Sequence, residues 1–548
     1  MENEENRNEE LYNFEERVEF IKSRLSSSYT YWSLRKLAKE EVMKSKYKPA
    51  ELSEQLPKIV KDLEIDILFK NKINELYNSM FSLETNSKFA IAIINGLDPS
   101  RSLPPLPGYF SQVHYEPLSS VSAARQEWSN YLKTRMLNIA FEFDKPLVCS
   151  RKTPWIFAVP EEHTKKSDKE EDTEKIELKR EREEIPNVFD DKNILNAIIE
   201  VNNGNYRNEL LEWGIVKVHF RTPSIDLLRV AYEELDVAIK QVGVDEDKMF
   251  VDERLAMGEK ILSKSYIPYM VQYAKRGVPT SLRGRFYSRI LECQFASKDS
   301  SYFEYLLEQV QKWELSIDRI VQEDSSDVCN DDKFFIFHEL LEKIYMSFLR
   351  DPWVSENLRA LPNLPIVGIS EGKPIGSVPP CGIIPFKHFA KYIAPITFLS
   401  EKPEECYYIF RNFYCKYLCF LHSLTSETRG IISLCRLFED LLQAYDSDLM
   451  YHLNQLGIPP LKIAFPWIFY SFVGFIEVEQ VYLLWDRMIG YDSPDIIVLL
   501  AVALFVYRSD AIMQCSSKEE IEDLFYDLSH MKAIPLIQNF LFVEKHLV

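Results

Sequence analysis

Three side chains that could bind a metal ion lie close together in the C-terminal half of the chain. Cys415, Cys419 and His422 follow one another at helical spacing, which places them on one face of a helix. A zinc site would need a fourth ligand and normally draws its ligands from more than one segment. Because free cysteine commonly packs as a small apolar residue, we interpret this face as part of a buried helix and predict no metal site and no cofactor.

A second group of residues matches the pattern around the nucleophile of serine hydrolases. Gly368, Ser370 and Gly372 form Gly-x-Ser-x-Gly, which works only where a strand precedes the serine and a helix follows it. Several prolines flank the match, so we interpret it as a turn. Neither a Gly-x-x-x-x-Gly-Lys-[Ser/Thr] phosphate loop nor a His-Glu-x-x-His zinc motif occurs in the sequence.

Composition limits the class of partner. The 548 residues include 65 Lys and Arg against 84 Asp and Glu, a formal charge of −19, which argues against nucleic acid or an anionic membrane as the main partner. The nine cysteines contain no Cys-x-x-Cys pair, so we expect reduced thiols and a cytoplasmic protein. The longest uncharged apolar run, 496–506, is shorter than the ~20 residues that span a bilayer. We therefore expect no transmembrane anchor, and recruitment to membranes only through a partner.

Composition and periodicity also divide the chain into five parts. Residues 1–16 are acidic, and we expect a disordered tail there. A helical N-terminal region is expected over 17–160, followed by a charged linker or insertion at 161–186, for which a lone charged helix is the alternative. A mostly helical connecting region at 187–270 leads into one large domain at 271–545.

Nearly every element is expected to be a helix. The exception is 213–220, where β-branched residues alternate in part and predict a strand. Helical periodicity predicts helices over 226–242, 406–424, 431–442, 467–475, 478–489 and 496–506. The sequence therefore predicts an all-α fold.

The segment from 275 to 287 has the most distinctive pattern in the chain. Gly277 and Pro279 interrupt a helical stretch, and Thr280 or Ser281 is suited to cap the helix that follows. Arg283 comes one helical turn later. The pattern predicts one helix over 266–273 and a second helix that begins near 280–281.

The same segment resembles the opening signature of TBC domains, Arg-x-Gly-[Ile/Val]-Pro-x-x-x-Arg-x-x-x-Trp. Lys275 stands at the first Arg of that signature and Tyr287 at its Trp. Trp485 and Asp486 lie in a stretch similar to the late Trp-Asp helix of these domains. The resemblance implies an all-α, C-terminal TBC-type domain preceded by a mostly helical N-terminal region, with a Rab-family small GTPase as the partner.

The resemblance also implies how such a domain would act. TBC domains supply two fingers to Rab GTPases: the arginine of Ile-x-x-Asp-x-x-Arg neutralises charge on the transferred phosphoryl group, and the glutamine of Tyr-x-Gln orients the attacking water. An arginine finger contributes about 10³–10⁵ in rate. A guanidinium suits this role because it stays charged and forks onto phosphate oxygens.

Both finger positions depart from the family pattern. The first motif falls on 321–327, which keeps Asp324 but has Asp327 where the arginine belongs, a charge of the wrong sign. The second falls on 382–386, where Pro385 replaces the glutamine and has neither an amide side chain nor a backbone N–H. Arg319 could act as a compensating arginine, although pairing with Glu323 is the favoured alternative.

Two functional hypotheses follow. The first is a TBC-domain regulator of Rab-family small GTPases, by resemblance an activator of GTP hydrolysis. The second is a catalytically degenerate TBC protein that serves as a Rab-binding or trafficking scaffold. The residues favour weak or absent two-finger catalysis, with the segments around Asp324 and Gly382 facing the nucleotide. We expect structural roles for Gly277, Pro279, Arg283, Asp324, Gly382, Trp485 and Asp486.

Overall fold

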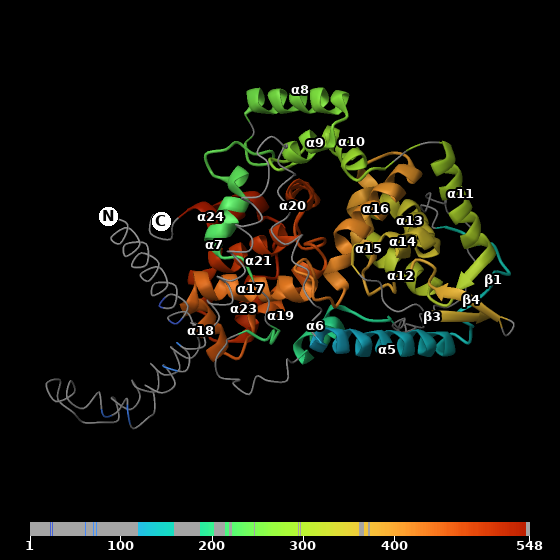
Figure 1. Ribbon diagram of the computed structural model, residues 1–548, viewed down its shortest axis with the longest axis horizontal. Helices are drawn as coiled ribbons and strands as arrows, with labels where there is room; N and C mark the ends of the chain where they lie inside the picture. The colour runs from blue at the N-terminus through green and yellow to red at the C-terminus, as the bar shows by residue number, and fades with distance from the viewer. Residues whose placement is uncertain are drawn as a thin grey trace, which may run out of the picture.

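A computed structural model describes residues 119–157, 187–201, 214–218, 222–360 except 246, 294, 296 and 332, then 366–370 and 373–543, with a few isolated positions between 22 and 73 (Figure 1). All structural statements below concern these residues. The acidic tail expected at 1–16 and the charged linker expected at 161–186 lie outside the described residues.

The first described elements lie along one edge of the helical body. Helix α5 (Ser119–Glu142) runs along the lower edge in Figure 1 and contacts α6 (Asp191–Glu200). Arg135 of α5 donates a hydrogen bond of 2.8 Å to the carbonyl of Asn187. Asp190 and Asn193 form a reciprocal capping box at the start of α6. Helix α5 is thereby attached to the segment that begins α6.

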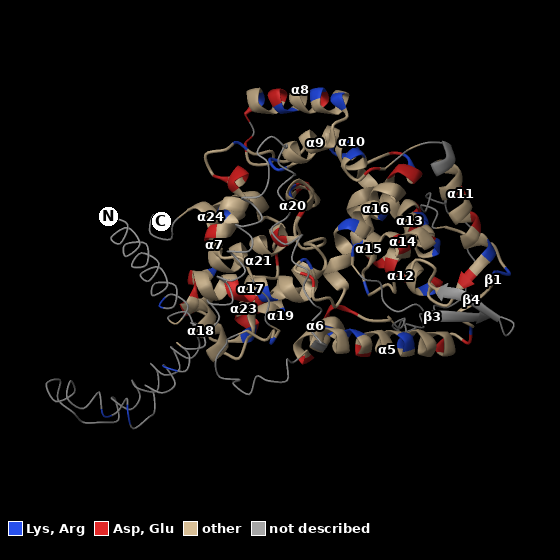
Figure 2. Ribbon diagram, viewed as in Figure 1, with Lys and Arg blue, Asp and Glu red and all other residues tan. Residues whose placement is uncertain are grey.

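Five short elements lead into the main body: α7 (Ile225–Ala231), η1 (Glu233–Leu235), α8 (Lys248–Lys264), α9 (Ile267–Ala274) and α10 (Thr280–Ile290). Acidic and basic residues alternate along α8, which lies at the upper edge (Figure 2). The buried residues of α8 are Arg254, Gly258 and Leu262. Their spacing of four puts them on the one face that packs on α9 and α10.

Helix α13 is the centre of the next group. Its residues from Leu341 to Arg350 are almost all buried, because helices on several sides pack against it. The group comprises α11 (Ser297–Lys312), β2 (Trp313–Leu315), α12 (Asp318–Cys329), η2 (Phe335–Phe337), α13 (His338–Arg350), α14 (Pro352–Asn357), β3 (Ile366–Ser370), β4 (Lys373–Val378), α15 (Ala390–Ile393), η3 (Ala394–Phe398), α16 (Pro403–Lys416) and η4 (Leu418–His422).

Helix α21 is the centre of the C-terminal group. Every residue from Asp495 to Phe505 is buried, because α17, α19, α20 and α24 pack around it. The group comprises α17 (Ile431–Tyr445), α18 (Ser447–Gln455), α19 (Pro460–Phe469), α20 (Val478–Tyr491), α21 (Asp495–Tyr507), α22 (Ser509–Ile512), α23 (Lys518–Leu524) and α24 (Ala533–Phe542). Within the described part of the chain, no helix combines the length and apolar character needed to cross a bilayer.

Two short antiparallel pairs are the only sheets among the described residues. β1 (Val148–Ser150) pairs with β2, which attaches the segment after α5 to the α13 group. β3 and β4 form a hairpin with a bulge at Gly368 and Ile369. Ser370 ends β3, and the next described element is β4, so a strand follows the serine where a hydrolase nucleophile would need a helix.

The all-α prediction is confirmed, but the expected strand at 213–220 is wrong. Residues 214–218 form no strand. The backbone N–H groups of Ile215 and Val216 donate to the Glu439 carboxylate at 2.7 and 3.2 Å. A side chain of α17 thus satisfies the donors that a neighbouring strand would have satisfied.

Three expected helices are shorter than predicted. The stretch 226–242 has only α7 and η1, 406–424 breaks at Tyr417 between α16 and η4, and α19 ends at Phe469 within 467–475. The expected cap by Thr280 or Ser281 is also wrong. Pro279 occupies the cap position in extended conformation with no side-chain cap bond, and Thr280 is the first helical residue. The helices expected at 431–442, 478–489 and 496–506 are present.

Candidate functional site

A buried carboxylate attaches the 275–287 segment to α20. Asp486, with no exposed surface, accepts hydrogen bonds from the Val278 N–H at 2.9 Å and the Tyr287 hydroxyl at 2.9 Å. Arg283 adds bonds from Nε and Nη2 at 3.1 and 3.2 Å. Burial opposes the charge of Arg283, but Asp486 outweighs it and raises the pKa of the guanidinium above its usual value. We call these four residues the Asp486 cluster.

Tight packing supports the Asp486 cluster on both sides. Gly277 has φ of +88°, and a Cβ there would lie 2.5 Å from Nη1 of buried Arg487, so both conformation and space require glycine. Trp485 is fully buried and donates from Nε1 to the Ser471 hydroxyl at 2.9 Å. Helix α9 packs on α20, and after the break at Gly277 and Pro279 the α10 side chains Arg283 and Tyr287 reach Asp486 of α20.

The segment expected to form the arginine-finger loop is instead helical. Residues 321–327 lie inside α12, and Asp324 is 6% exposed. The Asp324 carboxylate accepts the backbone N–H of His388 and that of Ala390, the latter at 2.9 Å. It therefore caps the N-terminus of α15. The cap joins α12, where the arginine motif falls, to the chain just after 382–386, where the glutamine motif falls.

Burial is the main cause of the pKa shifts of Asp324 and His388. It raises the pKa of Asp324 to about 7, against the two backbone hydrogen bonds that lower it. Burial also lowers the pKa of His388 to about 4, and Lys391 and Lys387 lower it further. His388 is therefore neutral at physiological pH and supplies no positive charge here.

Asp327 lies one helical turn beyond Asp324 and is exposed. Arg319 is exposed on the same helix, with its guanidinium 5.5 Å from the Phe143 ring centroid. Eight residues of helix separate Arg319 from Asp327, about 12 Å along the axis. Because α12 is continuous, Arg319 does not reach the finger position without unwinding of the helix.

The glutamine-finger segment turns inward. Gly382 adopts φ of +72° and its N–H donates to the Pro379 carbonyl at 2.9 Å. Ile383 is 3% exposed and Pro385 is buried. No side chain capable of orienting water occupies either motif position.

Lys391 is a lysine next to the cap whose charge acts on Asp324. Its Nζ lies 4.7 Å from the Tyr470 ring centroid and 5.3 Å from that of Phe475. Burial lowers the pKa of Lys391, while Asp324, Asp191 and Asp331 oppose that shift. No local pattern indicates a role for Lys391, because its aromatic neighbours come from the distant loop after α19.

A buried arginine pair on Asp318 also escaped prediction. Asp318 contacts Arg151 at 2.5 Å and Arg350 at 2.6 Å. Arg350 is thus committed to the interior and unavailable as a finger. Spacing within α12 could not predict this pair, because Arg151 follows β1 and Arg350 lies on α13.

The cysteine–histidine face is part of the core. His422 Nε2 lies 2.6 Å from the Tyr414 hydroxyl, and Cys419 donates to the Cys415 carbonyl. Burial lowers the pKa of His422 to about 3. Across the described ranges, no group of three His, Cys, Asp or Glu side chains has metal-binding geometry.

Comparison with known proteins agrees with these features. An all-α domain whose signature helix is fastened to a late Trp-Asp helix defines a TBC-type domain, and residues 390–513 match the Rab-GTPase-TBC domain family model. The chain is 35% identical over 372 residues to human TBC1 domain family member 19, covering 65% of this chain and 70% of that protein. The chain belongs to the TBC-domain family.

More distant similarities exist as well. The chain is 29% identical over 86 residues to mouse TBC1 domain family member 2B, covering 16% of this chain and 9% of that protein. Among solved structures, the Chlamydomonas flagellar RabGAP TBC domain gives a TM-score of 0.38 at 13% identity, covering 59% of this chain and 96% of that one. The Ypt/Rab-GAP domain of Gyp1p gives 0.40 at 14% identity, covering 53% and 96%. At these TM-scores the two structures add nothing to the fold assignment. The motifs around Gly382 and Trp485 also resemble member nineteen, in agreement with the first comparison.

Proposed function

We propose that this TBC-domain protein binds a Rab-family GTPase through the face that carries α12 and the 382–388 segment, and that it supplies no pair of catalytic fingers there. Family membership supports the Rab partner. One observation carries the rest: an exposed carboxylate, Asp327, and a buried proline, Pro385, occupy the two finger positions.

The electrostatics of this face favour binding over catalysis. Charge that builds on a transferred phosphoryl group requires a positive group aimed at it. Asp327 has the opposite sign, His388 is neutral, and Arg350 is paired with Asp318 inside the protein. Lys387 is an exposed cation on this face, but its ammonium lacks the fork with which a guanidinium binds phosphate oxygens. A Rab that retains its own glutamine would hydrolyse GTP on this face with at most weak assistance.

Single-turnover GTP hydrolysis across a panel of Rab proteins tests the proposal, with binding to the GTP-loaded forms measured in parallel. We expect binding to at least one Rab and acceleration below about 10³, the low end of the arginine-finger range. Greater acceleration would overturn the loss of catalysis. If Arg319→Ala then abolished that acceleration, Arg319 would be the finger.

Absence of binding to every Rab in the panel would overturn the partner itself. The Asp252→Asn variant serves as the matched control, because Asp252 is exposed on α8, away from α12.

A further inference from the structure

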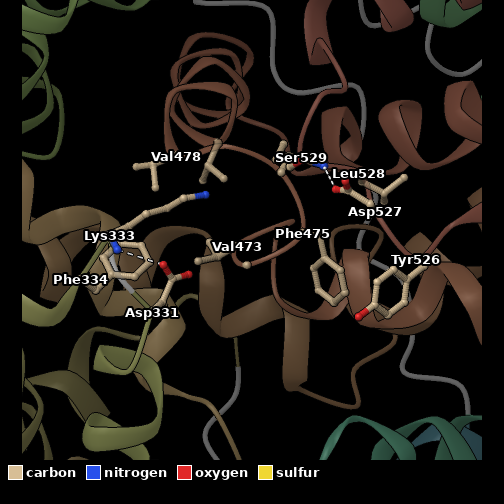
Figure 3. Close-up of a pocket in the computed structure, with 13 residues that line it drawn as sticks. Asp331, Lys333, Phe334, Val473, Phe475, Val478, Tyr526, Asp527, Leu528 and Ser529 are labelled. Atoms are coloured by element: carbon tan, nitrogen blue, oxygen red, sulfur yellow. Dashed lines mark hydrogen bonds between the residues drawn. The ribbon is translucent and has the colours of Figure 1, made fainter.

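A hollow lies next to the Asp324 cap, where three loops meet. It has a volume of about 170 Å³. Its walls come from the loop after α12, the loop between α19 and α20, and the loop between α23 and α24 (Figure 3). A cavity of ~150 Å³ holds a benzene ring, so this hollow has room for one large side chain.

The hollow is continuous with the face proposed to bind a GTPase. Asp331 lines it and lies one turn beyond Asp327 along the chain. Phe475 lines it and is also in contact with the Lys391 ammonium, which interacts with Asp324. A Cβ on Gly474, another lining residue, would lie 3.2 Å from Lys391. A protein docked on α12 therefore reaches the hollow without leaving the same surface.

Apolar side chains form much of its lining. Phe334, Val473, Ile476, Val481 and Leu528 are buried and form the apolar part of the lining, here called the apolar floor. Tyr526 also lines the hollow, with 91% of its surface exposed (Figure 3). This lining suits an aliphatic stem, and the exposed ring suits a cation beside it.

Two exposed carboxylates stand at opposite sides of the opening. Asp331 accepts the backbone N–H of Lys333 at 3.0 Å, and Asp527 accepts that of Ser529 at 2.8 Å (Figure 3). Neither makes an ion pair with any residue that the structure describes. Lys333 also lines the hollow, but its ammonium is paired with Glu477 at 3.0 Å.

Nearby cations leave the opening acidic. Lys391 faces Asp331 and is half-buried between its two rings, and Arg508 and His530 act on Asp527 from the outer side. Hydrogen bonds to Ser529 lower the pKa of Asp527, so its carboxylate is ionised at physiological pH. Among the residues that line the hollow, two carboxylates thus stand against one ammonium, and that ammonium is paired with Glu477.

We propose that this hollow receives an arginine or lysine side chain from the bound GTPase, with the aliphatic stem against the apolar floor and the cationic end between Asp331 and Asp527. The inference rests on the proposed function, since it takes the GTPase as the occupant. Arginine and lysine are the side chains that combine an apolar stem with a cation. The hollow would thus contribute to the choice of partner without contributing to hydrolysis.

The test uses the full chain and the GTP-loaded Rab that it binds in the panel. Asp331→Asn and Asp527→Asn should each weaken binding by about two- to fivefold, as exposed ion pairs do, and the double variant by about tenfold. The double variant should also lose part of the salt dependence of association. Tyr526→Ser should weaken binding by about two- to fivefold, while Asp252→Asn should bind like the wild type.

A double-mutant cycle identifies the occupant. Exposed Arg and Lys residues of that Rab are changed to Met one at a time, and one change should weaken binding to the wild type but add nothing to the loss in the double variant. Wild-type affinity and salt dependence in the double variant, with unchanged thermal melting, would overturn the inference. If the wild type binds no Rab at all, the proposed function fails and this inference fails with it.

Discussion

Two buried carboxylates of this protein hold helices together in different ways. Asp486 meets a guanidinium, a phenol and a backbone N–H, so its charge is balanced inside the core. Asp324 meets only two backbone N–H groups, and burial raises its pKa to about 7. The first is a complete ion-pair network and the second is a helix cap without a cation bonded to it.

The two carboxylates differ because Asp486 lies in the part of the protein that holds the fold, the scaffold, whereas Asp324 lies at the candidate functional site. The Asp486 cluster fastens α10 to α20 and keeps the polar groups of the family signature turned inward. The Asp324 cap fastens α12 to α15 at the face where the family pattern has its two fingers, and there the exposed group is Asp327. The Asp486 cluster keeps Arg283 and Asp486 of the family pattern with Tyr287 in place of its Trp, whereas the proposed finger positions carry Asp327 and Pro385.

The largest effect is expected from breaking the Asp486 cluster. Asp486→Ala leaves Arg283 buried without its anion, and loss of one partner of a buried pair typically costs about 3–5 kcal/mol. Chemical denaturation of the variant and the wild type measures this cost. Asp252→Ala, an exposed change on α8, should stay within about 0.5 kcal/mol. A loss of similar size in both variants would mean that the cluster does not hold the two helices together.

A pH-dependent effect is expected at Asp324. Its folded-state pKa of about 7 lies above the ordinary value of 3.8, so the folded state binds the extra proton between these values and stability falls as pH rises through that window. Asp324→Asn removes this contribution. The wild type should therefore lose stability relative to the variant as pH rises from about 4 to about 7.

Denaturation at several pH values measures that difference. Asp252→Asn, an exposed change on α8 whose carboxylate is not among the charges that shift Asp324, serves as the matched control and should track the wild type. A constant difference between the wild type and Asp324→Asn across the window would show that the cap carboxylate titrates normally.

The sequence predicted the scaffold better than the site. Helical periodicity and the Gly277–Pro279 break are local signals, and α20 and α21 match the expected ranges closely. The strand expected at 213–220 failed because its local alternation says nothing about Glu439, which lies on a helix more than two hundred residues later. The helical state of 321–327 and the aromatic contacts of Lys391 likewise depend on elements distant in sequence.

The smallest effect on stability is expected from Asp327→Arg, because the position is exposed on the surface of α12. The change should leave the free energy of unfolding within about 0.5 kcal/mol of the wild type. It places a guanidinium at the finger position, so hydrolysis by a bound Rab should accelerate. The gain should remain below about 10³, because Pro385 still provides no group to orient the water.

Single-turnover hydrolysis measures the gain, with Asp327→Gln as the variant that removes the negative charge and adds no positive one. Since α12 is held by Asp324 in both variants, a gain in Asp327→Arg alone would mean that this face lies against the phosphates. Equal rates in all three proteins would place the nucleotide elsewhere, and the contrast between scaffold and site would then have to be drawn at another surface.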